Sequence, residues 1–191
     1  MIKKELRKLY LEKRAALSDA ERRGRSARIS DAFFRRFDLT RVEVLHTFLP
    51  IERFGEIDTR LILSKIEDDF PRITMVAPRV DAASGELVHL RLAPETVLLK
   101  NAWQIEEPAG DDFVAPAAVD LVLVPLLCFD RQGFRVGYGK GFYDKFLEKC
   151  RADCLKIGLG FFPPEEKIDD TNDFDVRLDC CVTPEEIFFF N

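Results

Sequence analysis

The sequence is poor in the residues that build disulfide frameworks and zinc sites. Its five cysteines are odd in number and contain no pair at C-x-x-C spacing, so they indicate neither kind of site. The only two histidines are His46 and His89, which excludes a histidine-rich metal site. A metal bound by this chain would therefore be a hard cation held by carboxylates.

Long apolar runs are also missing. No uninterrupted apolar stretch reaches membrane-spanning length, and the first residues are charged and amphipathic, without the apolar centre of a signal peptide. We therefore expect a cytoplasmic protein with no membrane partner. With 191 residues, 47% of them hydrophobic, the chain can bury one substantial core, and we expect a single domain over residues 1–191.

Charge is distributed unevenly along the chain. Residues 1–41 hold 13 Lys and Arg against 6 Asp and Glu, so with an overall net charge of −5 the remainder carries −12. A basic segment suggests nucleic acid, but duplex DNA would be repelled by the acidic remainder, and a smaller polyanion fits better. An RNA-binding module that uses residues 1–41 is the non-enzymatic alternative, although the strand signatures of common RNA modules are missing.

Apolar periodicity predicts an α/β fold. The predicted helices are 2–17, a segment from the capping box Ser18-x-x-Glu21 to Phe37, a segment from about 59 to 69, and 142–150. The predicted strands are 42–48, 73–80, 87–92, 120–129, 156–162 and 178–183. Because strands alternate with helices, we expect one layered domain with a mostly parallel central sheet flanked by helices on both faces.

The strongest local signal is the glycine-rich stretch 133–144, GFRVGYGKGFYD, which joins the predicted strand 120–129 to the predicted helix 142–150. Strand, glycine loop and helix start bring backbone N–H groups and the positive end of a helix dipole into one concavity. Such a concavity suits a phosphate group. The alternative is a glycine-rich turn whose cations face solvent.

Two common phosphate motifs do not fit this stretch. A Walker A loop would need a hydroxyl residue after Lys140, and a dinucleotide fingerprint would need glycine or alanine at Phe142. Arg135 and Lys140 could still supply charge to the oxygens of a polyphosphate. Asp144 could reach the magnesium ion that such a polyphosphate carries.

Other candidate ligand residues are spread along the chain. Lys3, Arg7 and Arg14 form one stripe of the first helix and can converge on one anion, although such a stripe taken alone is more often a solvated face. Glu56 follows a predicted parallel strand, where α/β proteins collect ligand-binding side chains, or is a surface loop glutamate. Trp103 is the only tryptophan and stands in a polar, proline-ended stretch, where it could stack on a ligand ring.

Several motifs form a pattern over nearly the whole chain. They are Lys3-Lys4-x-Leu6-Arg7, Pro50 through Glu56-Ile57-Asp58-Thr59, Trp103-x-Ile105-x-Glu107-Pro108, Asp120-Leu-Val-Leu-Val-Pro125, Phe129-Asp130-x-x-Gly133-x-Arg135-x-Gly137-x-Gly139-x-Gly141-x-Tyr143-Asp144, and Asp175-Val176-x-Leu178-Asp179 before Val182-Thr183. In these motifs the sequence resembles the 5-formyltetrahydrofolate cyclo-ligase family, also called 5,10-methenyltetrahydrofolate synthetases. The layered α/β fold of that family agrees with the pattern of predicted elements.

The resemblance implies an ATP- and Mg²⁺-dependent ligase. In that family ATP phosphorylates the formyl oxygen of 5-formyltetrahydrofolate, N10 attacks the activated carbon, and loss of phosphate gives the methenyl bridge, with ADP and phosphate released. Phosphoryl transfer of this kind needs positioning and charge neutralisation rather than a nucleophilic side chain.

The resemblance also implies roles for individual residues. The implied ATP-binding residues are Lys3, Lys4, Arg7, Arg135, Gly137, Tyr138, Gly139, Lys140, Gly141, Phe142 and Tyr143, with Lys140 and Arg135 catalytic. The implied folate-binding residues are Glu56, Trp103, Tyr138, Phe142 and Tyr143, and the implied magnesium ligands are Asp144 and Asp175. Two positions depart from the family pattern: Phe142 stands where tyrosine is common, and Phe174 where histidine is common.

A second enzymatic hypothesis is a protein that handles a sugar phosphate or coenzyme A on a similar scaffold, because a fold does not determine a function. It predicts no ATP-dependent product from a folate. For the cyclo-ligase hypothesis we expect a small-molecule folate partner, no nucleic acid, and a monomer rather than an oligomer.

Overall fold

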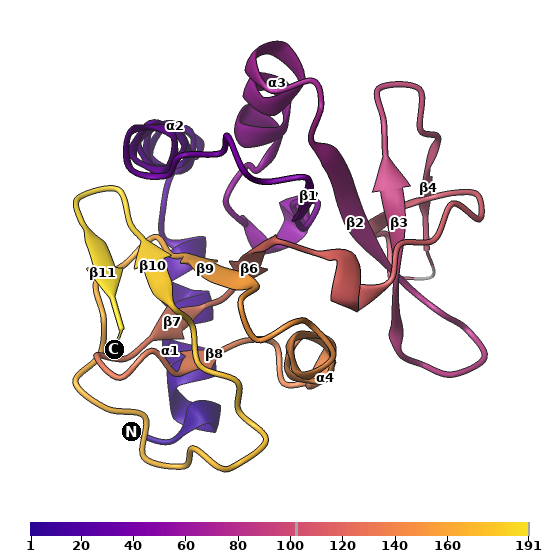
Figure 1. Cartoon of the computed structure of the whole chain (residues 1–191). Coiled ribbons are helices and arrows are strands. Elements are labelled where there is room, and N and C mark those ends of the chain that lie inside the picture. The colour runs from indigo at the N-terminus through magenta and orange to yellow at the C-terminus, as the bar shows by residue number, and fades with distance from the viewer. Residues whose placement is uncertain (102, 191) are drawn as a thin grey trace.

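The chain folds around a seven-stranded sheet, seen in a computed structural model that describes residues 1–101 and 103–190 (Figure 1). Its strands are β1 (Val44–His46), β2 (Thr74–Val80), β3 (Leu87–Leu92), β6 (Leu121–Pro125), β9 (Leu155–Leu159), β10 (Cys180–Val182) and β11 (Ile187–Phe189). Their order across the sheet is β11-β10-β9-β6-β1-β2-β3. The inner strands run parallel, and β11 and β3 pair antiparallel at the edges. The predicted mostly parallel sheet is confirmed.

Helices cover both faces of this sheet. α2 (Asp19–Arg36) and α3 (Arg60–Asp69) lie over one face, and α4 (Phe142–Glu148) lies under the other (Figure 1). α2 begins at the predicted capping box, because the Ser18 hydroxyl accepts from the N–H of Glu21 while the Glu21 carboxylate accepts from the N–H of Ser18. Helices on both faces therefore confirm the predicted layers.

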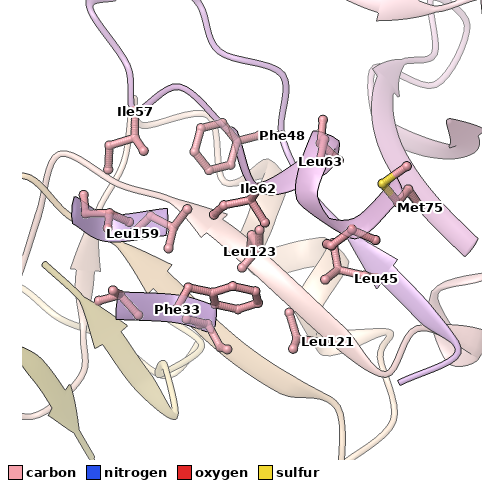
Figure 2. Close-up of a cluster of buried hydrophobic side chains, with 14 of the residues drawn as sticks. Phe33, Leu45, Phe48, Ile57, Ile62, Leu63, Met75, Leu121, Leu123 and Leu159 are labelled. Atoms are coloured by element: carbon pink, nitrogen blue, oxygen red, sulfur yellow. The ribbon is translucent and has the colours of Figure 1, made fainter. Parts of the chain in front are cut away.

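The larger core lies between the sheet and the helix pair α2 and α3. Figure 2 shows Phe33 and Ile62, which come from these helices, close to Leu45 and Leu123 of the sheet. All four side chains are buried, with at most 1% of their surface exposed. This apolar burial fixes the sheet, and with it the positions of the loops that follow the parallel strands.

The predicted strand 120–129 is wrong in its second half. β6 forms its first half, but its last two residues form β7 (Cys128–Phe129), which pairs with β8 (Arg135–Val136) in a separate antiparallel ribbon. The N–H of Leu127 donates to the carbonyl of Val136 over 2.8 Å, so the chain has already left the sheet at that residue. The glycine-rich loop therefore follows this ribbon rather than a sheet strand.

The apolar run continues through that break because α1 (Lys3–Ala15) covers the ribbon. Leu6 and Tyr10 of α1 are buried in a third cluster with Leu127 and Cys128. The apolar residues of 120–129 are therefore buried first in the sheet and then against α1. The sequence pattern does not distinguish these two kinds of burial.

The remaining regular elements are short. They are β4 (Leu98–Lys100), β5 (Glu106–Pro108) and the 3-10 helices η1 (Glu52–Phe54) and η2 (Pro116–Ala118). β4 and β5 pair as a hairpin, which was not predicted, and Trp103 lies between them with 56% of its surface exposed. Within the described part of the chain, we find no helix with both the length and the apolar character that a membrane crossing requires.

Candidate active site

Arg7 of α1 lies against the glycine-rich loop, although the two are far apart in the sequence. Its Nε donates to the carbonyl of Gly137 over 2.9 Å. Gly139 has a φ of 87°, and a Cβ added there would come within 2.9 Å of Arg7 Nη2. Glycine is needed at this position both for its left-handed backbone and for space. The contact brings the basic stripe of α1 to the candidate phosphate loop.

Tyr138 connects this loop to two other parts of the chain. Its hydroxyl donates to Glu56 Oε1 over 2.6 Å and accepts from Arg14 Nη1 over 3.0 Å. The other carboxylate oxygen of Glu56 accepts from the N–H of Ile51. Arg14 Nη2 also donates to the carbonyl of Leu126, just after β6, over 2.6 Å. Glu56 and Leu126 both follow parallel strands, so this network lies at the carboxyl edge of the sheet, as predicted for Glu56.

The network is enclosed, and this shifts its protonation equilibria. Burial raises the pKa of the Glu56 carboxyl, against the opposing effects of its hydrogen bonds and of the Arg14 charge. Burial also raises the pKa of Tyr138, and the nearby Glu56 raises it further. Arg14 is only 3% exposed. The sequence placed Arg14 with Lys3 and Arg7 in a stripe that could bind one anion, and in the structure Arg14 instead bonds Tyr138 and the Leu126 carbonyl.

The two predicted magnesium ligands each pair with a predicted phosphate-binding cation. Arg135 Nη2 donates to Asp144 Oδ1 over 2.9 Å, and Asp144 Oδ1 also accepts from the N–H of Val176. Lys3 Nζ forms an ion pair with Asp175 at 2.5 Å. The Arg135 guanidinium is buried, which lowers its pKa, while Asp144 and Asp175 both act to raise it. Asp144 therefore pairs directly with this buried cation, and the charge of Asp175 also favours its charged form.

This pair of carboxylates fits a magnesium ion that is bound together with a phosphate. Mg²⁺ commonly uses only one or two protein carboxylates and completes its coordination with phosphate oxygens and water. In the described residues there is no group of three or more His, Cys, Asp or Glu side chains arranged around a common point.

A cavity of about 360 Å³ lies beside the start of α4. Its apolar walls include Leu87, Val88, Phe113, Phe142 and Phe146, and its rim carries Glu86, Lys145 and Lys149. This volume and largely apolar lining are typical of small-molecule sites. Phe142 belongs both to the glycine-rich stretch and to this cavity, which places the two next to each other. The cavity itself was not predicted from the sequence.

The other predicted site residues lie outside the cavity lining. Lys4, Lys140 and Trp103 are exposed. Tyr143 packs between the two main core clusters, and its hydroxyl is buried without a hydrogen-bond partner among the described residues. Burial raises the pKa of Tyr143, and the charge of Glu56 adds to that effect. The structure thus places Tyr143 near Glu56, and Trp103 on the separate β4–β5 hairpin.

Comparisons with known proteins show the family of the chain. Residues 1–184 match the model of the 5-formyltetrahydrofolate cyclo-ligase family. The 5-formyltetrahydrofolate cyclo-ligase of Escherichia coli K12 is 28% identical over 160 residues, 77% of this chain and 82% of that protein. The Mycoplasma genitalium protein of the same name is 28% identical over 186 residues, 94% of this chain and 97% of that protein.

Solved structures give the same result. The structure of Aquifex aeolicus 5,10-methenyltetrahydrofolate synthetase is 28% identical and superposes with a TM-score of 0.84, covering 100% of this chain and 94% of that one. A synthetase of the same name from Mycoplasma pneumoniae, 23% identical with a TM-score of 0.76 over 96% of this chain and 99% of that one, supports the fold alone. The family match, the relatives and the fold agree, and the chain belongs to the 5-formyltetrahydrofolate cyclo-ligase family of ligases.

Proposed function

We propose that this protein converts 5-formyltetrahydrofolate to 5,10-methenyltetrahydrofolate in a reaction that consumes Mg-ATP and releases ADP and phosphate. Family membership supports the reaction class. The observation that carries the proposal is that Phe142 joins a cation-lined glycine loop to an apolar cavity. A triphosphate and the ring system of a folate would then lie next to each other. We further propose that the protein acts in the cytoplasm as a monomer.

The chemistry follows from the groups that surround the loop. Transfer of the γ-phosphoryl group to the formyl oxygen makes that oxygen a leaving group, N10 then adds to the formyl carbon and loses its proton, and phosphate departs. The protein must therefore orient the two substrates and neutralise phosphoryl charge. Lys140 is exposed on the loop and Arg7 is held against it, and both are suited to contact phosphate oxygens.

The two ion pairs have a defined role in this proposal. Lys3 with Asp175, and Arg135 with Asp144, each hold a cation for phosphate beside a carboxylate for magnesium. Bound Mg²⁺ would neutralise charge on the phosphoryl oxygens. When the nucleotide enters, its oxygens can take the place of Asp175 around Lys3. Because Arg135 is buried, we assign it mainly to holding Asp144 in position while adding its charge to the loop.

The remaining predicted ligands complete the folate side of the proposal. Glu56, which the Tyr138 hydroxyl holds at the carboxyl edge of the sheet, would accept hydrogen bonds from folate N–H groups. Trp103, exposed on its hairpin, would stack on a ring of the bound folate. Phe142 and Tyr143 would pack against the ring system, and Lys4, with the loop backbone from Gly137 to Gly141, would line the nucleotide.

The test is a direct assay of the purified protein with 5-formyltetrahydrofolate and Mg-ATP. Methenyl product should appear in the near ultraviolet, with one phosphate released for each product molecule. Omitting ATP or adding a magnesium chelator should abolish the signal. Product that forms equally without ATP, or ATP hydrolysis without product, would contradict the proposal. Salt-sensitive RNA binding without turnover would favour the RNA-binding alternative.

A further inference from the structure

A buried pair of histidines, which has no role in the proposed reaction, lies at the wall of the cavity. His89 of β3 lines the cavity, and its Nδ1 lies 3.1 Å from Nε2 of His46 on β1. Both rings contact Phe146 of α4, with centroids 4.0 and 4.5 Å away. His46 is 0% exposed and His89 only 4%. Two strands and a helix therefore hold the pair in place.

Both rings are neutral near pH 7. Burial lowers the pKa of His46 well below its ordinary value, and burial with the charge of Lys149 lowers the pKa of His89 to about 4. Lys149 is itself paired with Glu86 at 2.9 Å, which limits its field at the cavity. A neutral imidazole carries one N–H, so exactly one ring of the pair donates in the contact between them.

The surroundings of His46 indicate which ring donates. Its Nδ1 is buried with no hydrogen-bond partner among residues 1–101 and 103–190. If His89 donated, His46 would carry its proton on that Nδ1, which would leave a buried N–H without an acceptor. Unpaired buried N–H groups are rarer in proteins than unpaired acceptors. The favoured state has His46 donating from Nε2, and this leaves the His89 proton on Nε2.

We propose that His89 presents its Nε2–H to the cavity as a hydrogen-bond donor for a carbonyl oxygen or ring nitrogen of the folate, with His46 fixing that tautomer. The identity of the ligand rests on the proposed function. The tautomer of His89 follows from the contacts of the histidine pair alone. No partner for Nε2 is seen within the described part of the chain, and the adjoining cavity walls are the apolar Leu87, Val88 and Phe146. A donor set among these apolar side chains favours ligands with an acceptor at that point and disfavours those without one.

The tautomer can be measured without any ligand. The chain has two histidines, so long-range ¹H–¹⁵N correlation spectra at pH 7 contain only two ring spin systems. We expect both rings in the Nε2–H form. A His89 ring with its proton on Nδ1 would overturn the inference, whatever the enzyme assay shows.

Two substitutions of His89 test its two nitrogens separately: the Nε2–H that would donate to the cavity, and the Nδ1 that contacts His46. In H89Q the side-chain amide can place an N–H near the position of Nε2, whereas in H89N it reaches only the position of Nδ1. We expect H89N to raise the KM for 5-formyltetrahydrofolate about tenfold, the scale of one lost hydrogen bond, and H89Q to restore most of it. The KM for ATP should change less than twofold in both variants.

The kinetic outcomes distinguish this inference from the proposed function. If the wild-type protein forms no methenyl product, the proposed function fails, while the spectra still decide the tautomer. If the wild-type protein turns over and H89N binds folate as well as wild type, the role of His89 fails and the reaction stands. Equal losses in H89N and H89Q, with unchanged circular dichroism, would indicate a purely structural pair and would also overturn the inference.

Discussion

The side chain of Lys140 is exposed, whereas those of Lys3, Arg7 and Arg135 at the candidate phosphate site are buried or half-buried. We expect Lys140→Ala to lower turnover about a hundredfold or more, the scale of removing one preorganised charge-stabilising group. The stability of the variant should change little, because only an exposed side chain outside the core is lost. Steady-state kinetics and urea unfolding measure the two effects. Lys8→Ala, at an exposed position on α1, is the matched control, and near-normal turnover of Lys140→Ala would rule out the proposed role.

The Tyr138 hydroxyl has two partners, so its removal leaves two enclosed polar groups short of a hydrogen bond. Tyr138→Phe should lower the free energy of unfolding by about 1–3 kcal/mol, because Glu56 loses a donor and Arg14 loses an acceptor. Chemical denaturation at pH 7 measures this change. A variant as stable as the wild type would show that water replaces the hydroxyl in the network.

The histidine pair also predicts how stability depends on pH. An unfolded histidine binds a proton below about pH 6.5, whereas burial keeps His89 neutral down to about pH 4. The unfolded state therefore binds more protons between these values, and stability falls as the pH is lowered through this window. Between pH 7 and pH 5 the loss from His89 should be roughly 1.5 kcal/mol, with His46 adding to it.

The measurement is a comparison of unfolding curves at pH 7 and pH 5. His89→Leu should reduce the pH-dependent loss of stability, whatever its effect on stability at pH 7. If the wild type and this variant lost the same free energy on acidification, His89 would not be the titrating group.

At the scale of elements, Gly158 in β9 shows how closely the sheet is packed. A Cβ added there would lie 2.6 Å from Leu178 Cδ1 and 2.8 Å from Leu126 Cδ2. We expect Gly158→Ala to destabilise the protein by about 1–3 kcal/mol through overpacking. Gly24→Ala is the control, because Gly24 lies in the interior of α2 with nothing within 4 Å of its added Cβ.

The control should behave in the opposite way. Alanine at position 24 has the higher helix propensity and should stabilise the protein by up to about 1 kcal/mol. Thermal unfolding measures both variants. Destabilisation by Gly24→Ala, or tolerance of Gly158→Ala, would contradict the packing described here.

The sequence predicts an element well when its apolar residues are all buried against the same part of the structure. α2 has a capping box at Ser18 and one apolar face, and its boundaries agree with the prediction to within about a residue. The predicted strand 120–129 has two causes of burial, the sheet and then α1, and periodicity does not distinguish them. The β4–β5 hairpin was missed because its exposed Leu98, Leu99 and Lys100 lack strand alternation.

The residues of the candidate site also fall into two groups, those that could be predicted from the sequence and those that could not. The glycine-rich stretch 133–144 and the basic stripe of Lys3 and Arg7 could be predicted, because each is a local pattern in the sequence. The structure brings Arg7 to the loop. The histidine pair was not readable, because His46 and His89 meet only when β1 and β3 are placed on either side of β2. The roles of these residues in binding and catalysis stay predictions.

At the scale of the whole molecule, the proposed site joins parts of the chain that are far apart in the sequence. Mg-ATP should therefore slow amide hydrogen exchange in three segments together: α1, residues 137–141 of the loop, and residues 163–179 around Asp175. α2 and α3, which cover the other face, should change little. Exchange followed by mass spectrometry checks this, and protection confined to α2 and α3 would place the nucleotide elsewhere.

The distance along the chain between contacting residues has a further consequence, for synthesis. Arg7 meets a residue 130 positions later, and Lys3 meets one 172 positions later. At roughly 5–20 residues per second, a ribosome needs roughly 10–30 s to make the second partner of Lys3 after Lys3 itself. During synthesis the basic first helix has no β7–β8 ribbon to pack on until residue 136 has been made, and Lys3 has no Asp175 to pair with until about 40 residues later. The proposed nucleotide site can therefore form only after five of the seven sheet strands have been made.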